Sequence, residues 1–263
     1  MTRRLILAAV LALGLVTTAE AGIDEGFAAY NRGDYEKALR EFRPLAERGD
    51  ATAQYNLGVM SRDGEGVPQN YAEALKWFHL AAEQGYVQAQ LNLGTLYGDG
   101  KGVPQNYAEA VKWYRKAAEQ DLAEAQFNLG IMYGDGRGVP QNYAEALKWY
   151  REAAEQGYVQ AQLNLGIRYD KGEGVPQNYA EALKWYRKAA EQGHVQAQLN
   201  LGAMYINGTG VRQDYVQGHM WSNLAAAQGN EMARENRDLA EKNMTPEQIT
   251  EAQRLAREWK PKQ

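Results

Sequence analysis

The sequence predicts an all-α solenoid, and three observations lead to this fold class. The hexapeptide Ala-Gln-x-Asn-Leu-Gly recurs every 36 residues. Each copy contains two stretches whose apolar residues follow a helical period, and Gly-rich segments separate these stretches. A fixed repeat of this length is typical of proteins whose units stack only on their neighbours and form an extended surface. The pattern therefore favours a binding scaffold, with copies that start at Ala53, Ala89, Ala125, Ala161 and Ala197.

Residues 1–21 are predicted to be a secretory signal peptide. Arg3 and Arg4 form a basic start, Leu5–Val16 an apolar run, and Ala19-Glu20-Ala21 a small-x-small cleavage site. The apolar run of 12 residues is short for a permanent membrane anchor, although an uncleaved anchor is the alternative. We expect a mature chain that begins at Gly22, is periplasmic or secreted, and does not insert into the membrane.

Residues 22–50 are predicted to form a degenerate first unit of the tetratricopeptide kind. This segment keeps the Tyr35, Ala38, Leu39 and Phe42 positions of the later copies. Its loop, however, is only 32–34, much shorter than the loops that follow.

Residues 51–230 are predicted to form five repeats of 36 residues, each with two helices. In the third copy the first helix places Leu129 and Tyr133 four residues apart on one face. Gly130 beside them allows a close approach by the partner helix. A Gly-rich loop follows, and Val139 after it is expected to act as an apolar plug.

The second helix of each repeat has a predicted start and a predicted end. Asn142 is the expected N-cap, and Glu145 three residues later completes the pattern of a capping box. Gly157 is the expected helix end. Asp121 replaces this glycine in the second copy, which leaves its cap geometry in question. The other capping pairs are Asn70/Glu73, Asn106/Glu109, Asn178/Glu181 and the variant Asp214/Gln217, and the other end glycines are Gly85, Gly193 and Gly229.

Residues 231–263 are predicted to form C-terminal capping helices. Thr245 is the expected N-cap of the last one, with Pro246 at its first position and Gln248 at its third. A single apolar stripe follows, as expected of a helix that covers the end of a repeat array: Ile249, Ala252, Ala256 and Trp259.

The repeat resembles the Sel-one-like repeat family, a longer-looped relative of tetratricopeptide repeats. The residues that carry the resemblance in the second copy are Leu93-Gly94, Tyr97, Gly100, Gly102-Val103, Tyr107, Ala110, Trp113-Tyr114 and Ala117-Ala118. The resemblance implies a right-handed superhelical solenoid of antiparallel helix pairs that binds proteins or peptides. By similarity to tetratricopeptide repeats, the first helices are expected to line a concave surface.

Two sets of positions are candidates for the partner-binding surface. One position of the first helix changes between copies but stays apolar or aromatic, and the next residue is asparagine in every copy. An asparagine side chain both donates and accepts, so the ladder can hold a peptide backbone or bond a neighbouring helix, and both readings stay open. The sets are Tyr55, Leu91, Phe127, Leu163 and Leu199, and Asn56, Asn92, Asn128, Asn164 and Asn200.

Composition and motif content argue against several function classes. The chain has no cysteine, three histidines in different elements and a net charge of −4, so we expect no cofactor, no metal site and no nucleic-acid partner. Neither Ser61 nor Ser222 begins a Ser-x-x-Lys motif, which disfavours a cell-wall or beta-lactam hydrolase. A peptidoglycan or glycan binder is a further alternative, but strict periodicity favours packing for the tryptophans Trp77, Trp113, Trp149, Trp185 and Trp221. The partner itself and the oligomeric state are not evident from the sequence.

Overall fold

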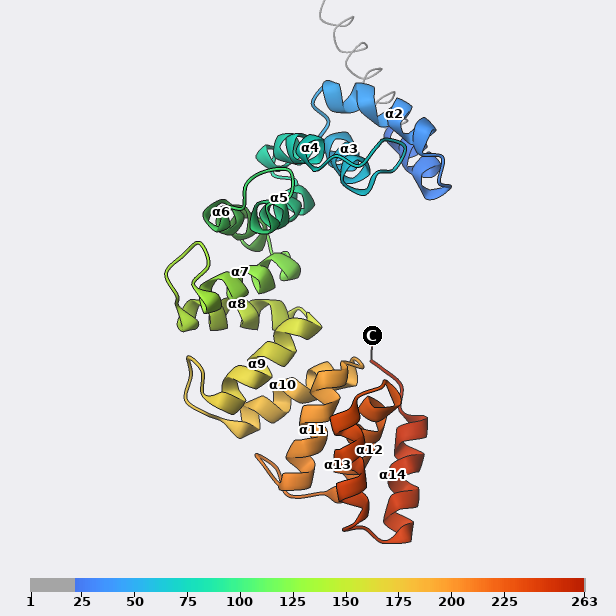
Figure 1. The fold of residues 1–263 in the computed structure, drawn as a ribbon, viewed down its shortest axis with the longest axis vertical. Helices are drawn as coiled ribbons and strands as arrows, with labels where there is room; N and C mark the ends of the chain where they lie inside the picture. The colour runs from blue at the N-terminus through green and yellow to red at the C-terminus, as the bar shows by residue number, and fades with distance from the viewer. Residues whose placement is uncertain (1–21, 263) are drawn as a thin grey trace, which may run out of the picture. The chain divides into compact units, whose positions relative to one another are not determined.

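The computed structural model describes residues 22–262, and the predicted signal segment 1–21 lies outside the described residues. Within residues 22–262 every regular element is a helix, which confirms the all-α prediction (Figure 1). None of these helices combines the length and apolar character that a membrane crossing requires.

A helix at 22–31 is followed by helices of 11 to 13 residues. Each repeat contributes a first helix and a second helix, and two further helices follow the last repeat. The bounds are α2 Tyr35–Glu47, α3 Ala51–Asp63, α4 Tyr71–Glu83, α5 Val87–Asp99, α6 Tyr107–Ala118, α7 Ala123–Asp135, α8 Tyr143–Glu155, α9 Val159–Lys171, α10 Tyr179–Glu191, α11 Val195–Asn207, α12 Tyr215–Ala227, α13 Glu231–Glu241 and α14 Pro246–Glu258.

The described residues form two compact units, one of residues up to Ala125 with Arg137–Val139 and one of Gln126–Gly136 with the residues from Pro140 onward. In the first unit, α3 packs against α4 and α5 against α6, while α2–α3 and α4–α5 contacts join successive pairs. In the second unit, α9 packs against α10 and α11 against α12, and the α8–α9 and α10–α11 contacts join the pairs. Each helix pair therefore buries its apolar faces against itself and its sequence neighbours, as stacked repeats do.

The predicted close approach at Gly130 is confirmed, and in the first four repeats the equivalent glycine contacts an aromatic ring, whereas Gly202 of the fifth contacts Ser222. A Cβ placed on Gly130 would lie 2.7 Å from the ring of Tyr150, and Gly58 faces Phe78 in the same way at 2.6 Å. Both rings are buried. A side chain at these positions would push the two helices of the repeat apart, so only glycine permits the observed separation.

The second helices begin at the predicted N-caps, but the predicted capping box is only half present. Asn70 Oδ1 accepts from the backbone N–H of Glu73. The backbone N–H of Asn70 donates instead to the carbonyl of Ser61, at 2.7 Å, so it offers no hydrogen to the Glu73 carboxylate. That carboxylate contacts Lys76 Nζ at 3.3 Å. The loop bond thus replaces half of the box, and it recurs between Asn106 and Tyr97, Asn142 and Tyr133, Asn178 and Tyr169, and Asp214 and Tyr205.

The ends of the second helices confirm the predicted glycine positions and answer the question over Asp121. Gly85 and Gly157 have φ of 89° and 92°, in the left-handed region that glycine favours. Asp121 occupies the same position with φ of 62°, and it is the one non-glycine residue with positive φ among the described residues. The repeat geometry therefore overrides the ordinary preference of an L-residue at Asp121.

The tryptophans of the second helices pack between repeats, as predicted. Trp113, Trp149, Trp185 and Trp221 are between 3% and 8% exposed. Trp77 is half-buried and differs from the others in this respect.

The helices after the last repeat cover its apolar face. The complete capping box predicted for α14 is present, since Thr245 Oγ1 accepts from the N–H of Gln248 and Gln248 Oε1 from the N–H of Thr245. Ala252 is fully buried, and the ring of Trp259 lies edge-on to Trp221 with centroids 6.2 Å apart. The predicted stripe of α14 therefore faces α12.

Candidate partner-binding surface

Tyr55 of α3 is held in a fixed orientation by a ring of α4 and by the ring of the residue before α5. Its ring stacks on Tyr86 at a centroid distance of 4.8 Å and is tilted against Phe78 at 5.8 Å. Burial raises the pKa of Tyr55 above its ordinary value, so the phenol stays neutral near pH 7. The side chain remains half-buried rather than covered. Part of a pre-oriented aromatic ring is thus open to a ligand.

A polar cluster lies between α3 and α5 of the same unit. Arg62 Nη1 donates to Asn92 Oδ1 at 2.6 Å, and its Nη2 lies 2.7 Å from Asp63 Oδ2. Leu91 beside Asn92 is half-buried. A ligand at this cluster would meet Arg62, which is already bonded to Asn92 and Asp63, together with the apolar side chain of Leu91.

The first helices of the second unit repeat this arrangement with different side chains. The Phe127 ring contacts Tyr150 and Tyr158, with centroids 5.7 and 5.2 Å apart, and stays half-buried. Leu163 packs partly against the core of α10–α12 and is also half-buried. Both side chains therefore pack against the core on one side and remain partly exposed on the other.

The side chains of the asparagine ladder mainly form hydrogen bonds within their own helices. Asn56 Nδ2, Asn92 Nδ2 and Asn164 Nδ2 donate to the carbonyl four residues earlier, at 2.7, 2.8 and 2.9 Å. Asn200 instead accepts from Gln196 Nε2 at 2.9 Å. Asn128 is half-buried beside Phe127. These bonds indicate a structural role for the side-chain N–H groups of Asn56, Asn92 and Asn164. The side-chain oxygen of Asn164 accepts no hydrogen bond within residues 22–262.

Leu199 differs from the other predicted surface positions. It is only 5% exposed, because Ala225 and Ala226 of α12, Ala233 of α13 and Val195 pack around it. The predicted surface is corrected at this position, since α12 of the same repeat and α13 after it cover Leu199 and leave too little exposed area for a partner.

The glutamine of the repeated hexapeptide has a structural role that was not predicted from the sequence. Gln54 is 4% exposed, donates to the carbonyl of Ala46 in α2 and accepts from Gln84 Nε2 at the end of α4. One amide thus joins three helices. Only the invariance of the Ala-Gln pair among the copies pointed to such a role. In the later repeats the equivalent glutamine likewise accepts a hydrogen bond from the glutamine 30 residues later, as seen at Gln90, Gln126, Gln162 and Gln198.

The remaining polar residues do not assemble a metal site. Residues 22–262 contain no group of three or more His, Asp or Glu side chains that could hold an ion. His219 is fully buried and its Nε2 lies 2.9 Å from Glu241 Oε1. We therefore find no centre in the described part of the chain to which a metal could be assigned.

The geometry defines an all-α protein built from repeated helix pairs, a scaffold typical of protein–protein interaction. The Sel1 repeat model matches residues 51–86, 87–122, 123–158, 159–194 and 195–230. The chain therefore belongs to the Sel1 repeat family, which confirms the resemblance drawn from the sequence. Among curated proteins, none matches.

Two solved structures show the same fold at substantial identity. One is c5321, a protective antigen of uropathogenic Escherichia coli strains with an SLR fold, which is 40% identical with a TM-score of 0.84 over 91% of this chain. This chain spans about half, 53%, of that protein. The other is a Sel1 repeat protein from Oxalobacter formigenes, 35% identical with a TM-score of 0.74, covering 94% of this chain and 98% of that one.

Proposed function

We propose that the protein is an exported, non-catalytic scaffold that binds a protein or peptide through the exposed faces of its first helices. The observation that supports this most is the set of half-buried aromatic and apolar side chains that point from otherwise regular repeats. They vary between copies, while the glycine three residues after each of them does not. The proposed contact residues are Tyr55, Leu91, Phe127 and Leu163, with Asn92, Asn128, Asn164 and Asn200 beside them.

Protein–protein recognition suits this surface because interface energy concentrates in a few anchored aromatic and apolar residues. Tyr55 and Phe127 lose little rotamer freedom on binding, since neighbouring rings already hold them. The buried tryptophans argue against a glycan ladder, because a sugar needs an accessible ring face and those rings are between repeats.

The hydrolase alternative finds no support in the arrangement of serine and histidine. Ser222 and His219 are both 0% exposed, so no substrate reaches them. Ser222 Oγ and His219 Nδ1 are each buried without a hydrogen-bond partner, so they do not form a nucleophile–base pair. A turnover assay with a chromogenic beta-lactam and with peptidoglycan is expected to show no activity. Turnover by the wild type that is lost in Ser222→Ala or in Ser61→Ala would contradict the scaffold proposal.

Site-specific photo-crosslinking in intact cells tests the binding surface. A photoreactive residue at Leu91, Phe127 or Leu163 is expected to give a discrete adduct with the same partner. Matched controls at Lys148 and Lys184, which are exposed on second helices, are expected to give none. Adducts from the controls alone would move the binding surface to the second helices. Intact-mass analysis of the same material tests export, since a chain retaining residues 1–21 would exclude cleavage.

A further inference from the structure

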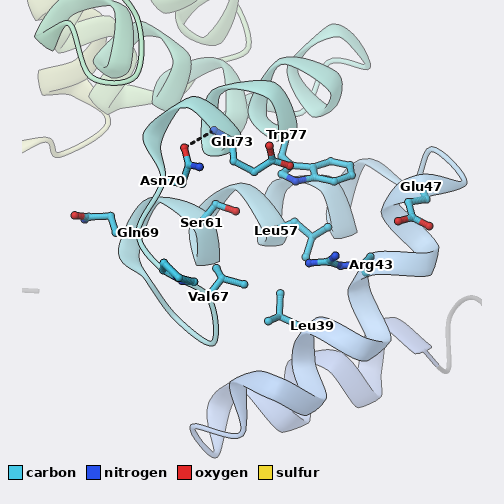
Figure 2. Close-up of a pocket in the computed structure, with 11 residues that line it drawn as sticks. Leu39, Arg43, Glu47, Leu57, Ser61, Val67, Gln69, Asn70, Glu73 and Trp77 are labelled. Atoms are coloured by element: carbon cyan, nitrogen blue, oxygen red, sulfur yellow. Dashed lines mark hydrogen bonds between the residues drawn. The ribbon is translucent and has the colours of Figure 1, made fainter.

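A cleft of about 310 Å³ lies in the first unit, between α2, α3, α4 and the loop before α4 (Figure 2). It is separate from the proposed partner surface. Leu57 and Ser61 line the cleft, and at 100° per residue they lie on the opposite side of α3 from Tyr55 and Val59. A ligand in this cleft would therefore leave the first-helix surface free.

The cleft exists because one repeat has lost a large side chain. Ser61 occupies the position that is tyrosine in all four later repeats, namely Tyr97, Tyr133, Tyr169 and Tyr205. Tyr97, Tyr169 and Tyr205 pack against the cores of their own units. The helices around Ser61 keep the repeat geometry, so the volume of a tyrosine side chain is left open.

The arginine that would meet such a tyrosine is still present. Arg151 Nη2 donates to the hydroxyl of Tyr169 at 2.7 Å, and Arg187 Nη2 donates to that of Tyr205 at 2.5 Å. Arg43 stands at the equivalent position of α2. Within residues 22–262 it makes no hydrogen bond or ion pair, and Figure 2 shows its guanidinium directed from α2 into the cleft.

The other walls suit an aromatic ring. Leu39 and Leu57 supply branched apolar surface, and Trp77 closes one side in Figure 2. Trp77 is half-buried where its counterparts are nearly covered, so part of its indole faces the open volume. The missing tyrosine accounts for this difference, because Tyr97 packs in the same core cluster as Trp113, and Tyr205 in the same cluster as Trp221.

The charges at the rim select a neutral ligand. Glu47 and Glu73 both line the cleft, and the Glu73 carboxylate lies 3.3 Å from Lys76 Nζ. The carboxylate of Glu47, which is unpaired within residues 22–262, offsets the charge of Arg43, so the cleft has no net positive charge to attract a carboxylate or phosphate. A phenol accepts from the guanidinium without adding charge.

We infer that this cleft binds a tyrosine side chain of a peptide or protein partner, in the place that an internal tyrosine takes in the later repeats. The ring lies against Leu39, Leu57 and Trp77, and the phenolic oxygen accepts a hydrogen bond from Arg43. The site does not depend on the first-helix surface, so the two proposals fail or succeed separately.

Filling the cleft from within tests its shape without any ligand. Ser61→Tyr is expected to raise the melting temperature, because it restores the packing of the later repeats, with Ser61→Phe as the matched control that lacks the hydroxyl. Arg43→Met is expected to lower the melting temperature in the Ser61→Tyr background but not in the wild type. A lower melting temperature for both Ser61→Tyr and Ser61→Phe would show that the cleft does not fit the ring and would overturn the inference.

A titration with 4-methylphenol, the side chain of tyrosine, tests binding directly. Saturable shifts of the Trp77 indole resonance, assigned with Trp77→Phe, are expected in the wild type and are expected to vanish in Ser61→Tyr. Arg43→Met should weaken binding by about tenfold, the effect of one hydrogen bond to a charged group. Toluene should bind more weakly than 4-methylphenol, and 4-methylbenzoate should not bind better. Equal shifts in wild type and Ser61→Tyr, no saturable shift, or preference for the benzoate would each overturn the assignment.

Discussion

Gln54 and its counterparts show how a single side chain determines the spacing of neighbouring repeats. An amide buried at 4% exposure must satisfy its donor and acceptor, because an unmade bond of a buried polar group costs about 1–3 kcal/mol. Gln54 does this only when the carbonyl of Ala46 and the amide of Gln84 are both within reach. The requirement therefore specifies one arrangement of three helices, where an apolar residue would tolerate several.

The proposed surface predicts different outcomes for neighbouring residues. Phe127→Ala should weaken partner binding by about 1–3 kcal/mol, the usual range for an anchored aromatic residue. Asn128→Ala should weaken it by about 0.5–1.5 kcal/mol if the amide bonds the ligand. Trp149→Ala should instead lower stability, by about 3–5 kcal/mol, because the ring is buried. Titration calorimetry and thermal melts on each variant measure the two effects.

The contacts of Phe127 with Tyr150 and Tyr158 mean that its truncation also lowers stability somewhat. Phe127→Leu, which introduces the residue found in the second, fourth and fifth copies, is the matched control that preserves packing. If Asn128→Ala and Phe127→Leu lower the melting temperature and leave affinity unchanged, the first-helix face is not the binding surface.

His194 predicts a dependence of stability on pH. It precedes α11, its Nδ1 is buried without a partner, and burial lowers its pKa below 6.5. Below that value the unfolded chain binds more protons than the folded one, so stability falls as the pH decreases until the folded pKa is passed. Thermal melts between about pH 7.5 and 5 should show this loss. His194→Tyr, which copies Tyr86 and Tyr158, should show a smaller loss, and identical pH profiles would exclude His194 as the cause.

At the scale of the element, each helix pair is defined by bonds at its ends. The first helices end on glycines such as Gly64 and Gly172, and the loop then returns an N–H to the carbonyl of the preceding helix. This return bond positions the N-cap of the second helix and displaces the glutamate that a free capping box would use. Loop length is therefore a structural feature of these repeats, since the bond needs the loop to span the pair.

Asp121 predicts a stabilising substitution at a helix end. Its φ of 62° costs an L-residue free energy that glycine avoids. Asp121→Gly should raise the free energy of unfolding by about 0.5–1 kcal/mol, after allowance for the extra freedom of glycine in the unfolded chain. Denaturant unfolding measures the change. Gly157→Ala is the reverse control, because a Cβ there meets nothing within 4 Å and only backbone strain remains. If both variants leave stability unchanged, the left-handed residue is not strained.

At the scale of the whole molecule, the segment after Gly229 completes the repeat array. α13 covers Leu199 and Ala226, and Lys262 N donates to the carbonyl of Glu191 at 2.8 Å. Truncation after Gly229 should therefore lower the melting temperature and the solubility, because apolar surface of the last repeat becomes exposed. Differential scanning calorimetry on the truncated chain measures this. Trp259→Ala is a milder variant expected to give part of the loss, and an unchanged melt after truncation would mean that the segment is only an appendage.

The sequence by itself determined the helix pairs, their N-caps, their terminal glycines and the buried tryptophans, because these follow from local periodicity and from residues that recur every 36 positions. Only the tertiary structure decided which surface positions stay open. Leu199 is covered by a helix more than 30 residues later, and Asn92 is bonded by Arg62 from the preceding repeat. The cleft at Ser61 likewise depends on α2 and α4 together. Exposure results from contacts between segments distant in the chain, and local patterns carry no information about them.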